Sequence, residues 1–145
     1  AGIGPFALHI AKSQPSAKIV AVEKNPDAVT FMEENIRINY LGSKVVPLLG
    51  DVRDILPKLG QKFDRIIMPY PEESWKFLEL AFNYANPNAV IHFYAFVNEK
   101  EIEKAKEKIK KIALRANRKA EVKRVVVAGS YAPRVWRYCF DILVK

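Results

Sequence analysis

The chain has 145 residues and a net charge of +8, and half of its residues are hydrophobic. This length and composition predict one soluble globular domain, and no apolar run approaches the roughly 20 residues that a membrane span needs. The single cysteine excludes an internal disulfide and fits a reducing, cytoplasmic environment. We expect a monomer that needs no membrane and no metal, and whose basic excess binds a polyanion such as nucleic acid.

The basic excess is concentrated in residues 99–124, which hold eight lysines and three arginines against five glutamates. An apolar stripe with helical spacing runs through this segment, formed by Ile102, Ala105, Ile109 and Ile112. Two interpretations of the lysines stay open: they contact RNA, or they are the solvated face of an ordinary amphipathic helix.

The chain opens on a glycine-rich turn in residues 1–6, and an apolar strand from Ile19 to Val22 ends at Glu23. A glycine turn before a helix, followed by an acid at a strand's carboxyl end, is typical of a nucleoside-cofactor site in a doubly wound α/β sheet. The glycines allow a tight turn, and the acid can accept both hydroxyls of a ribose. In this fold a strand precedes the glycine turn, so we expect the first strand, in a longer protein, upstream of Ala1.

Pro5 favours one cofactor over another. The dinucleotide fingerprint directs helix N-terminal N–H groups at a pyrophosphate, and proline has no N–H to donate. We therefore expect S-adenosylmethionine, which carries no phosphate, rather than a nicotinamide cofactor. The other interpretation of the motif is an ordinary strand-to-helix turn.

Caps, turns and periodicity predict alternating strands and helices along the rest of the chain. Asn25 and Pro26 are a helix start signal. Pro47 cannot donate a hydrogen bond within a ladder, so its strand should lie at a sheet edge. The expected helices are Pro5 to about Ser13, Pro26 to about Asn39, Val52 to about Leu59, Trp75 to about Tyr84 and the basic helix to about Leu114. The expected strands after the first are Val45–Leu49, Phe63–Met68, Ala89–Phe96, Val122–Val127 and Trp136–Val144.

Two prolines enclose an aromatic residue after the Phe63–Met68 strand, in Pro69-Tyr70-Pro71. Such a stiff, extended loop can stack on a planar base, although a rigid connection is the other interpretation. His92 is expected to be a packed, hydrogen-bonded residue rather than a catalyst. Cys139 is expected to be a small residue in a buried strand rather than a nucleophile.

The last two strands have no helix between them, and the short link in residues 128–134 makes them antiparallel neighbours. Alternating β/α units followed by such a pair are the usual ending of a class I methyltransferase sheet, with strand order 3-2-1-4-5-7-6 and strand 7 antiparallel. The predicted fold is therefore a Rossmann-like α/β domain of this class, with its first strand upstream of the chain. This ending is a second argument against a nicotinamide cofactor.

Several stretches together resemble the archaeal and eukaryotic tRNA guanine-37 N1-methyltransferases of the Met-10+ like type, and the related wybutosine-pathway aminocarboxypropyltransferases. The matching stretches span nearly the whole chain in the family's order: residues 1–6, 23–28, 34–39, 47–53, 64–69, 90–94 and 130–134. The family's loop after strand four reads Asn-Leu-Pro in its best known branch, where it places the target guanine. This chain has Pro69-Tyr70-Pro71 there, which indicates another branch.

The resemblance implies that S-adenosylmethionine lies with its methionine part on the glycine turn, its ribose on Glu23 and its adenine beside Asp51. The full set of expected cofactor-binding residues is Ala1, Gly2, Gly4, Pro5, Phe6, Glu23, Lys24, Asn25, Asp51, Val52, Arg53 and Pro69. The target base is expected on Pro69, Tyr70 and Pro71, and tRNA phosphates on Tyr131, Arg134 and Arg137. A tight turn in which Tyr131 merely packs is the alternative for the last group.

The implied reaction is methyl transfer to N1 of guanine 37 in the tRNA anticodon loop, which needs alignment of the reactants and a general base. In the family that base lies upstream of the glycine turn, so we expect this chain alone to bind cofactor but to transfer poorly. One alternative is transfer of the aminocarboxypropyl group of the same cofactor to a modified guanine. An alternative of another class is a non-catalytic RNA-binding module, which the acids Glu23 and Asp51 disfavour.

Overall fold

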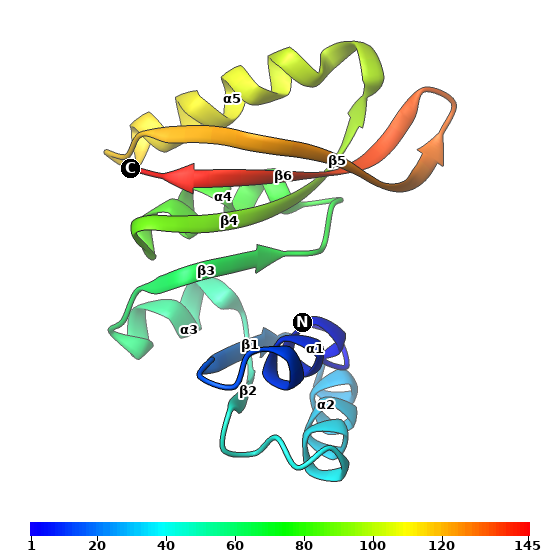
Figure 1. Cartoon of the computed structure of the whole chain (residues 1–145), viewed down its shortest axis with the longest axis vertical. Helices are drawn as coiled ribbons and strands as arrows, with labels where there is room; N and C mark the ends of the chain where they lie inside the picture. The colour runs from blue at the N-terminus through cyan, green and yellow to red at the C-terminus, as the bar shows by residue number, and fades with distance from the viewer. The chain divides into compact units, whose positions relative to one another are not determined.

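The computed structural model describes residues 1–145, which divide into two compact units, Ala1–Gly60 and Gln61–Lys145 (Figure 1). Each unit has its own sheet and its own buried core. None of the helices has the length and apolar character that crossing a membrane requires. The expectation of a single domain stays a prediction.

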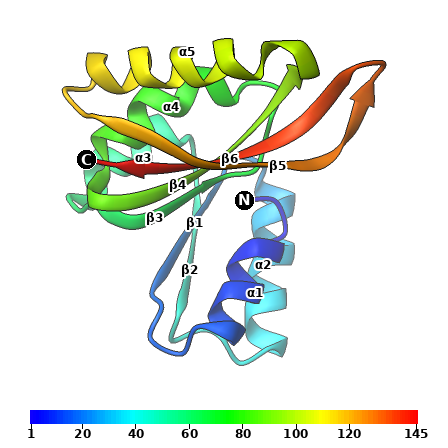
Figure 2. The ribbon, with the colours of Figure 1, turned by 45° about the horizontal axis from the view of Figure 1, so that its top comes forward.

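The first unit is built on a two-stranded parallel ladder of β1 (Ile19–Glu23) and β2 (Val45–Leu49). The helices α1 (Pro5–Ser13) and α2 (Pro26–Ile38) pack against one face of this ladder (Figure 2), and α3 (Val52–Leu59) follows β2. The core that they enclose consists of small and medium apolar side chains: Ala7, Ala11, Ala21, Val29, Met32, Ile36, Leu41 and Val45.

Local signals in the sequence set the boundaries of these elements. Asn25 caps α2 by accepting a hydrogen bond from the backbone N–H of Asp27, and Pro26 occupies the first turn. β2 pairs with β1 alone, so the prediction that Pro47 marks an edge strand is confirmed.

The second unit is a four-stranded sheet in the order β3-β4-β6-β5, in which β3 and β4 are parallel and β6 is antiparallel to both neighbours. The strands are β3 (Phe63–Met68), β4 (Ala85–Asn98), β5 (Ala120–Ala132) and β6 (Val135–Val144). The helices α4 (Ser74–Asn83) and α5 (Ile102–Arg115) cover one face of this sheet (Figures 1 and 2), and the short 3-10 helix η1 (Glu99–Glu101) leads into α5.

Alternation along β4 separates the two faces of this sheet. From Ala89 on, its odd-numbered residues, such as Ile91 and Phe93, are buried under the helices, whereas its even-numbered residues, such as His92 and Tyr94, are half-buried on the opposite face. The predicted stripe of α5 is confirmed, because Ala105, Ile109 and Ile112 are buried and Ile102 packs against the same core.

The two ladders match the two halves of the predicted strand order. The expected first strand is left out of this comparison. Strands 3-2 of the predicted order correspond to β2-β1, and strands 4-5-7-6 correspond to β3-β4-β6-β5. The predicted strand 7 is β6, which is antiparallel as expected. The predicted α/β class is confirmed.

Two of the predicted strands were too short. β4 begins at Ala85 rather than Ala89, and β5 runs to Ala132, so Pro133 and Arg134 alone connect β5 to β6 rather than the whole segment 128–134. The ladder continues through this segment because register shifts on either side of Gly129, whose φ is 151°, absorb the irregularity. Arg134 then closes the turn with a positive φ of 61°.

Candidate functional site

The glycine turn adopts the backbone conformation that its composition predicts. Gly2 and Gly4 have φ values of 58° and 88°, a region that other residues enter at a cost. A Cβ added to Gly4 would lie 2.9 Å from Cγ of the buried Met32, so the turn packs directly on α2. Asn35 of α2 also donates its side-chain amide to the carbonyl of Ile3 at 3.1 Å.

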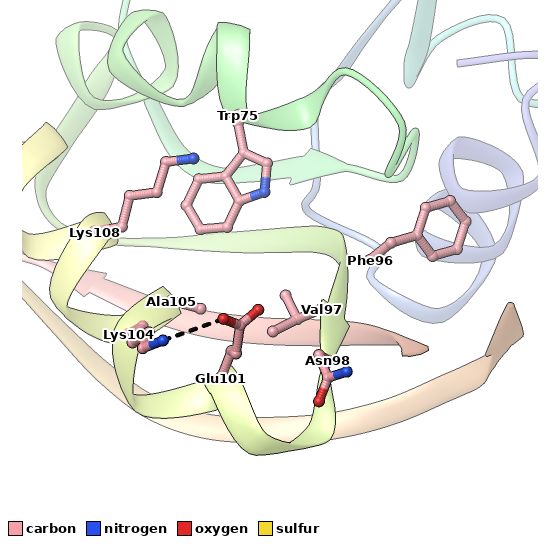
Figure 3. Close-up of a pocket in the computed structure, with 8 residues that line it drawn as sticks. All are labelled: Trp75, Phe96, Val97, Asn98, Glu101, Lys104, Ala105 and Lys108. Carbon is pink, nitrogen blue, oxygen red and sulfur yellow. Dashed lines mark hydrogen bonds and ion pairs between the residues drawn. The ribbon is translucent and has the colours of Figure 1, made fainter. Parts of the chain in front are cut away.

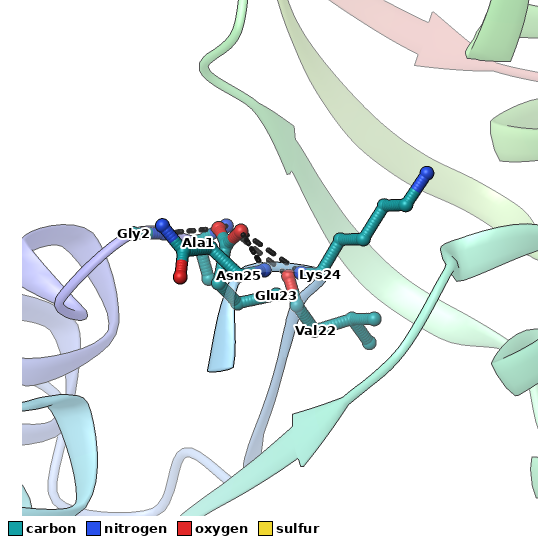
Figure 4. A network of polar contacts seen from close by, with 6 residues as sticks. All are labelled: Ala1, Gly2, Val22, Glu23, Lys24 and Asn25. Carbon is teal, nitrogen blue, oxygen red and sulfur yellow. Dashed lines mark hydrogen bonds and ion pairs between the residues drawn. The ribbon is translucent and has the colours of Figure 1, made fainter. Parts of the chain in front are cut away.

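Glu23 lies at the carboxyl end of β1, and its carboxylate is held by four N–H donors (Figure 4). Oε2 accepts from the amino group of Ala1 at 2.8 Å and from Gly2 at 2.6 Å, and Oε1 accepts from Lys24 at 2.8 Å and Asn25 at 2.9 Å. Partial burial opposes ionisation, but the hydrogen bonds from Asn25 and Gly2, together with the charged amino group with which this 145-residue chain begins, outweigh it and lower the pKa of Glu23 to about 2. The side chain is therefore a fixed anion, and a diol bound to it has to replace some of these donors.

Asp51 follows the carboxyl end of β2 and caps α3. Its Oδ1 accepts from the backbone N–H of Arg53 at 2.9 Å, and the guanidinium of the same residue holds both carboxylate oxygens, at 2.9 and 2.7 Å. These hydrogen bonds from Arg53 hold the pKa of Asp51 well below its usual range. Because Gly50 donates its N–H to the carbonyl of Glu23, the first unit brings Glu23 and Asp51 to the same edge of its ladder.

The Pro69-Tyr70-Pro71 loop lies in the second unit, between β3 and α4. The two prolines are half-buried, whereas Tyr70 is 57% exposed. The Tyr70 hydroxyl donates to Glu72 at 2.8 Å, an interaction that raises the pKa of Tyr70. Buried Ser74 anchors the end of the loop by donating to the carbonyl of Pro71 at 3.2 Å. The loop therefore presents an aromatic ring on a fixed backbone.

β4 runs to the base of the β5–β6 hairpin, since its last residue, Asn98, pairs with Val135 beside the two-residue turn. Tyr131 belongs to β5 rather than to a loop, which corrects the sequence prediction. Its ring stacks on Phe96 with centroids 4.0 Å apart, yet it is 63% exposed. Arg134 is exposed in the turn itself.

Arg137 has a structural contact that the sequence prediction missed. Its guanidinium donates to the carbonyl of Ala128 through Nε at 3.2 Å and through the terminal nitrogen at 2.6 Å, so it braces its own hairpin. Gly129 makes room for this brace, because a Cβ there would lie 3.1 Å from the guanidinium.

A polar row crosses all four strands on the half-buried face of the second sheet. Arg65 donates to Nε2 of His92 at 2.8 Å, so Nδ1 of that ring carries its proton and donates to Asp141 at 2.6 Å. Arg124 completes the row by pairing with Asp141 at 3.3 Å. The expectation that His92 is a packed, hydrogen-bonded residue is confirmed.

Cys139 lies beside this row, with its sulfur 3.7 Å from the Asp141 carboxylate. Burial, together with the neighbouring carboxylate, raises the pKa of Cys139 to about 11. The ligand atoms of His92, Cys139 and Asp141 lie within 4.8 Å of one another, but guanidinium groups and the thiol proton already engage them. The sequence prediction did not include this cluster, although the alternation of β4 and β6 puts all three residues on one face.

Comparison with known proteins identifies the same family by a family model and by individual relatives. A family model described as the TRM5/TYW2 methyltransferase domain matches residues 1–123. The tRNA (guanine(37)-N(1))-methyltransferase Trm5b of Pyrococcus abyssi is 38% identical over 100% of this chain and 42% of its own length. The tRNA(Phe) (4-demethylwyosine(37)-C(7)) aminocarboxypropyltransferase of Methanocaldococcus jannaschii is 37% identical over 97% of this chain and 56% of its own length.

The crystal structure of M. jannaschii TYW2 in complex with AdoMet superposes with a TM-score of 0.91 at 35% identity, over 100% of this chain and 65% of that one. The chain thus spans about half the length of the curated relatives that it matches. The similarity extends over both units described above.

Proposed function

Because the chain belongs to the TRM5/TYW2 methyltransferase domain family, we propose that it is the cofactor-binding part of an S-adenosylmethionine-dependent tRNA methyltransferase that modifies N1 of guanine 37. The observation that carries the proposal is the preorganised edge of the first unit, where the Glu23 carboxylate lies against the glycine turn. A cytoplasmic, monomeric enzyme is our expectation.

The residues of this edge fit the proposed cofactor. The absence of a Cβ at Gly4 keeps the turn close to α2, and α1 begins at Pro5, which leaves no N–H there for a phosphate. In the proposal the turn contacts the methionine part, Glu23 accepts the ribose hydroxyls, and the start of α3 at Asp51 borders the adenine. Ala1, Phe6, Lys24, Asn25, Val52 and Arg53 complete the proposed set in this unit.

When bound, the cofactor supplies an activated methyl group, and the chain's task is to orient two reactants. The exposed ring of Tyr70 on its fixed loop offers a stacking surface for the target guanine. The exposed turn at Arg134 and the neighbouring Tyr131 offer contacts to tRNA phosphates and bases.

A second candidate is transfer of the aminocarboxypropyl group from the same cofactor to a modified guanine. It is supported by Pro69, which stands where the methyltransferase branch has an asparagine, and by the nearly equal identities to the two kinds of relative, 38% and 37%. The two reactions differ in which carbon beside the sulfur meets the nucleophile.

Calorimetric titration with S-adenosylmethionine tests the cofactor assignment, using wild type, Glu23→Gln and the control Glu33→Gln. Glu33 is an exposed acid on α2, so the control changes the charge equally. Loss of a charge-assisted hydrogen bond should weaken binding by about 10- to 100-fold in Glu23→Gln and leave the control unchanged. Equal effects of the two substitutions would contradict the role of Glu23.

Transfer by the intact protein to a tRNA transcript, with label either on the methyl group or on the carboxylate carbon of the cofactor, separates the two activities. Methyl label in the tRNA supports N1 methylation, and carboxylate label supports aminocarboxypropyl transfer. Absence of both labels, with cofactor bound, would favour the non-catalytic RNA-binding module.

A further inference from the structure

A cavity of about 230 Å³ lies in the second unit where β4 leads into α5 (Figure 3). Its lining includes the indole of Trp75 from the start of α4, Val97 and Asn98 from the end of β4, and Glu101, Lys104 and Lys108 from η1 and α5. We call it the Trp75 pocket. It is smaller than the roughly 300–1,000 Å³ of pockets that enclose a drug-sized ligand, so it suits one base with its phosphate rather than a whole cofactor.

The pocket combines an aromatic surface with positive charge. The Lys108 ammonium lies 4.1 Å from the centroid of the Trp75 ring, and Lys104, one helical turn earlier, pairs with Glu101 at 3.2 Å (Figure 3). Phe93 contacts the same indole edge-on, with centroids 4.7 Å apart. The contact with Phe93 therefore fixes the indole on its core side, while the ammonium groups of Lys104 and Lys108 lie at the pocket.

The pocket adjoins both elements that the proposed function assigns to RNA. Trp75 follows the Pro69-Tyr70-Pro71 loop at the first turn of α4. On the other side, the N–H of Glu99 in η1 donates to the carbonyl of Arg134 in the hairpin turn at 3.0 Å. The pocket therefore lies next to both the target-base loop and the hairpin turn.

We propose that the Trp75 pocket binds a nucleotide next to the target base, with its base against the indole and its phosphate on Lys104 and Lys108. This rests on the proposed function and adds a subsite to it. Aromatic rings that stack with bases beside cations that contact phosphates are the recurring means of holding single-stranded nucleic acid. In this arrangement the phosphate competes with Glu101 for Lys104, and the base shares the indole with Lys108.

The test compares two double variants of the intact protein with equal charge change. Lys104→Gln with Lys108→Gln removes the pocket cations, and Lys110→Gln with Lys111→Gln removes two exposed cations of the same helix that do not line the pocket. Binding of an anticodon stem-loop RNA is measured over a range of salt concentrations. The pocket variant should bind about tenfold more weakly, with a salt slope reduced by about 1, and the control should change about twofold or less.

Fluorescence of Trp75, in a Trp136→Phe background that leaves it as the only tryptophan, provides a readout of the base. Binding of the stem-loop should quench it, and an RNA that is abasic at the nucleotides flanking guanine 37 should not. Equal weakening of the two double variants, or no quenching while the RNA binds, would overturn the pocket assignment and leave the proposed function intact. Failure of the wild-type protein to bind the stem-loop would refute both.

Discussion

Replacement of Gly4 by alanine should destabilise the first unit more than the same replacement at a glycine that has a positive φ but no close neighbour for an added Cβ. The φ of 88° costs a non-glycine residue about 1–2 kcal/mol. The new Cβ would also lie 2.9 Å from Cγ and 3.3 Å from Sδ of Met32, a fully buried side chain. Overpacking of this kind costs about 1–3 kcal/mol, so Gly4→Ala should lower the free energy of unfolding by about 2–5 kcal/mol.

Two other glycines provide matched controls for the backbone contribution. Gly2 and Gly60 have φ values of 58° and 60°, and a Cβ at either position would meet no atom within 4 Å. Alanine at each should therefore cost only the conformational part, about 1–2 kcal/mol. Gly60 lies at the end of α3, away from the proposed cofactor edge, so it separates stability from binding.

Urea unfolding followed by circular dichroism measures the three variants against wild type. The steric argument predicts that Gly4→Ala lowers the free energy of unfolding by at least about 1 kcal/mol more than either control does. If Gly4→Ala and Gly60→Ala lower the free energy of unfolding equally, the contact between the turn and Met32 does not constrain the site, and the argument for a close-packed glycine turn is wrong.

Three further outcomes follow from the contacts described above. Because burial raises the pKa of Cys139 to about 11, iodoacetamide at pH 8 should label the native protein at least about tenfold more slowly than the urea-unfolded protein; equal rates would show that the thiol is accessible. Asp141→Asn should lower the free energy of unfolding by about 1–3 kcal/mol through its lost contacts with His92 and Arg124, while Glu107→Gln, at an exposed site, should have little effect. In the 145-residue chain that begins at Ala1, the pKa of Glu23 falls from 4.5 to about 2 on folding, so its carboxylate stabilises the fold above pH 4.5 and this contribution is lost as the pH falls through 2. The difference in free energy of unfolding between wild type and Glu23→Gln should shrink over that window, and a constant difference would contradict the shift.

The helix starts and the edge strand were predictable because single residues determine them. Pro5 opens α1, Asn25 caps α2 and Pro47 lies in a strand with one neighbour, as the sequence predicts. Each of these signals depends only on the residue's own dihedral angles, hydrogen-bond donors and acceptors. The position of Glu23 at the end of a strand was predictable from the apolar run Ile19–Val22 before it.

The hairpin and the polar row were not predictable from local patterns. Where β5 ends depends on whether Gly129 and its neighbours keep pairing with β6, which a propensity cannot decide. The contact between His92 and Asp141 joins residues 49 positions apart and depends on the register of β4 against β6. Sequence analysis can place such residues on a face but cannot align them across strands.

The distribution of charge fits the proposed cationic cofactor and the proposed polyanionic partner. Residues 1–60 hold seven basic and six acidic residues, whereas residues 61–145 hold 17 basic and 10 acidic residues. The first unit is thus nearly neutral and keeps two fixed carboxylates, Glu23 and Asp51, at its proposed cofactor edge, while the basic excess belongs to the second unit.

This separation predicts that salt acts on the two ligands differently. Raising the salt concentration from about 50 to 200 mM should weaken binding of the stem-loop RNA at least tenfold, because phosphate contacts release counterions. Binding of S-adenosylmethionine, measured by calorimetry over the same range, should change about twofold or less, because it depends on short hydrogen bonds at a partly buried site. If salt weakened the binding of both ligands alike, cofactor binding would depend on the overall electrostatic field of the protein rather than on Glu23. The proposed division of roles between the two units would then be wrong.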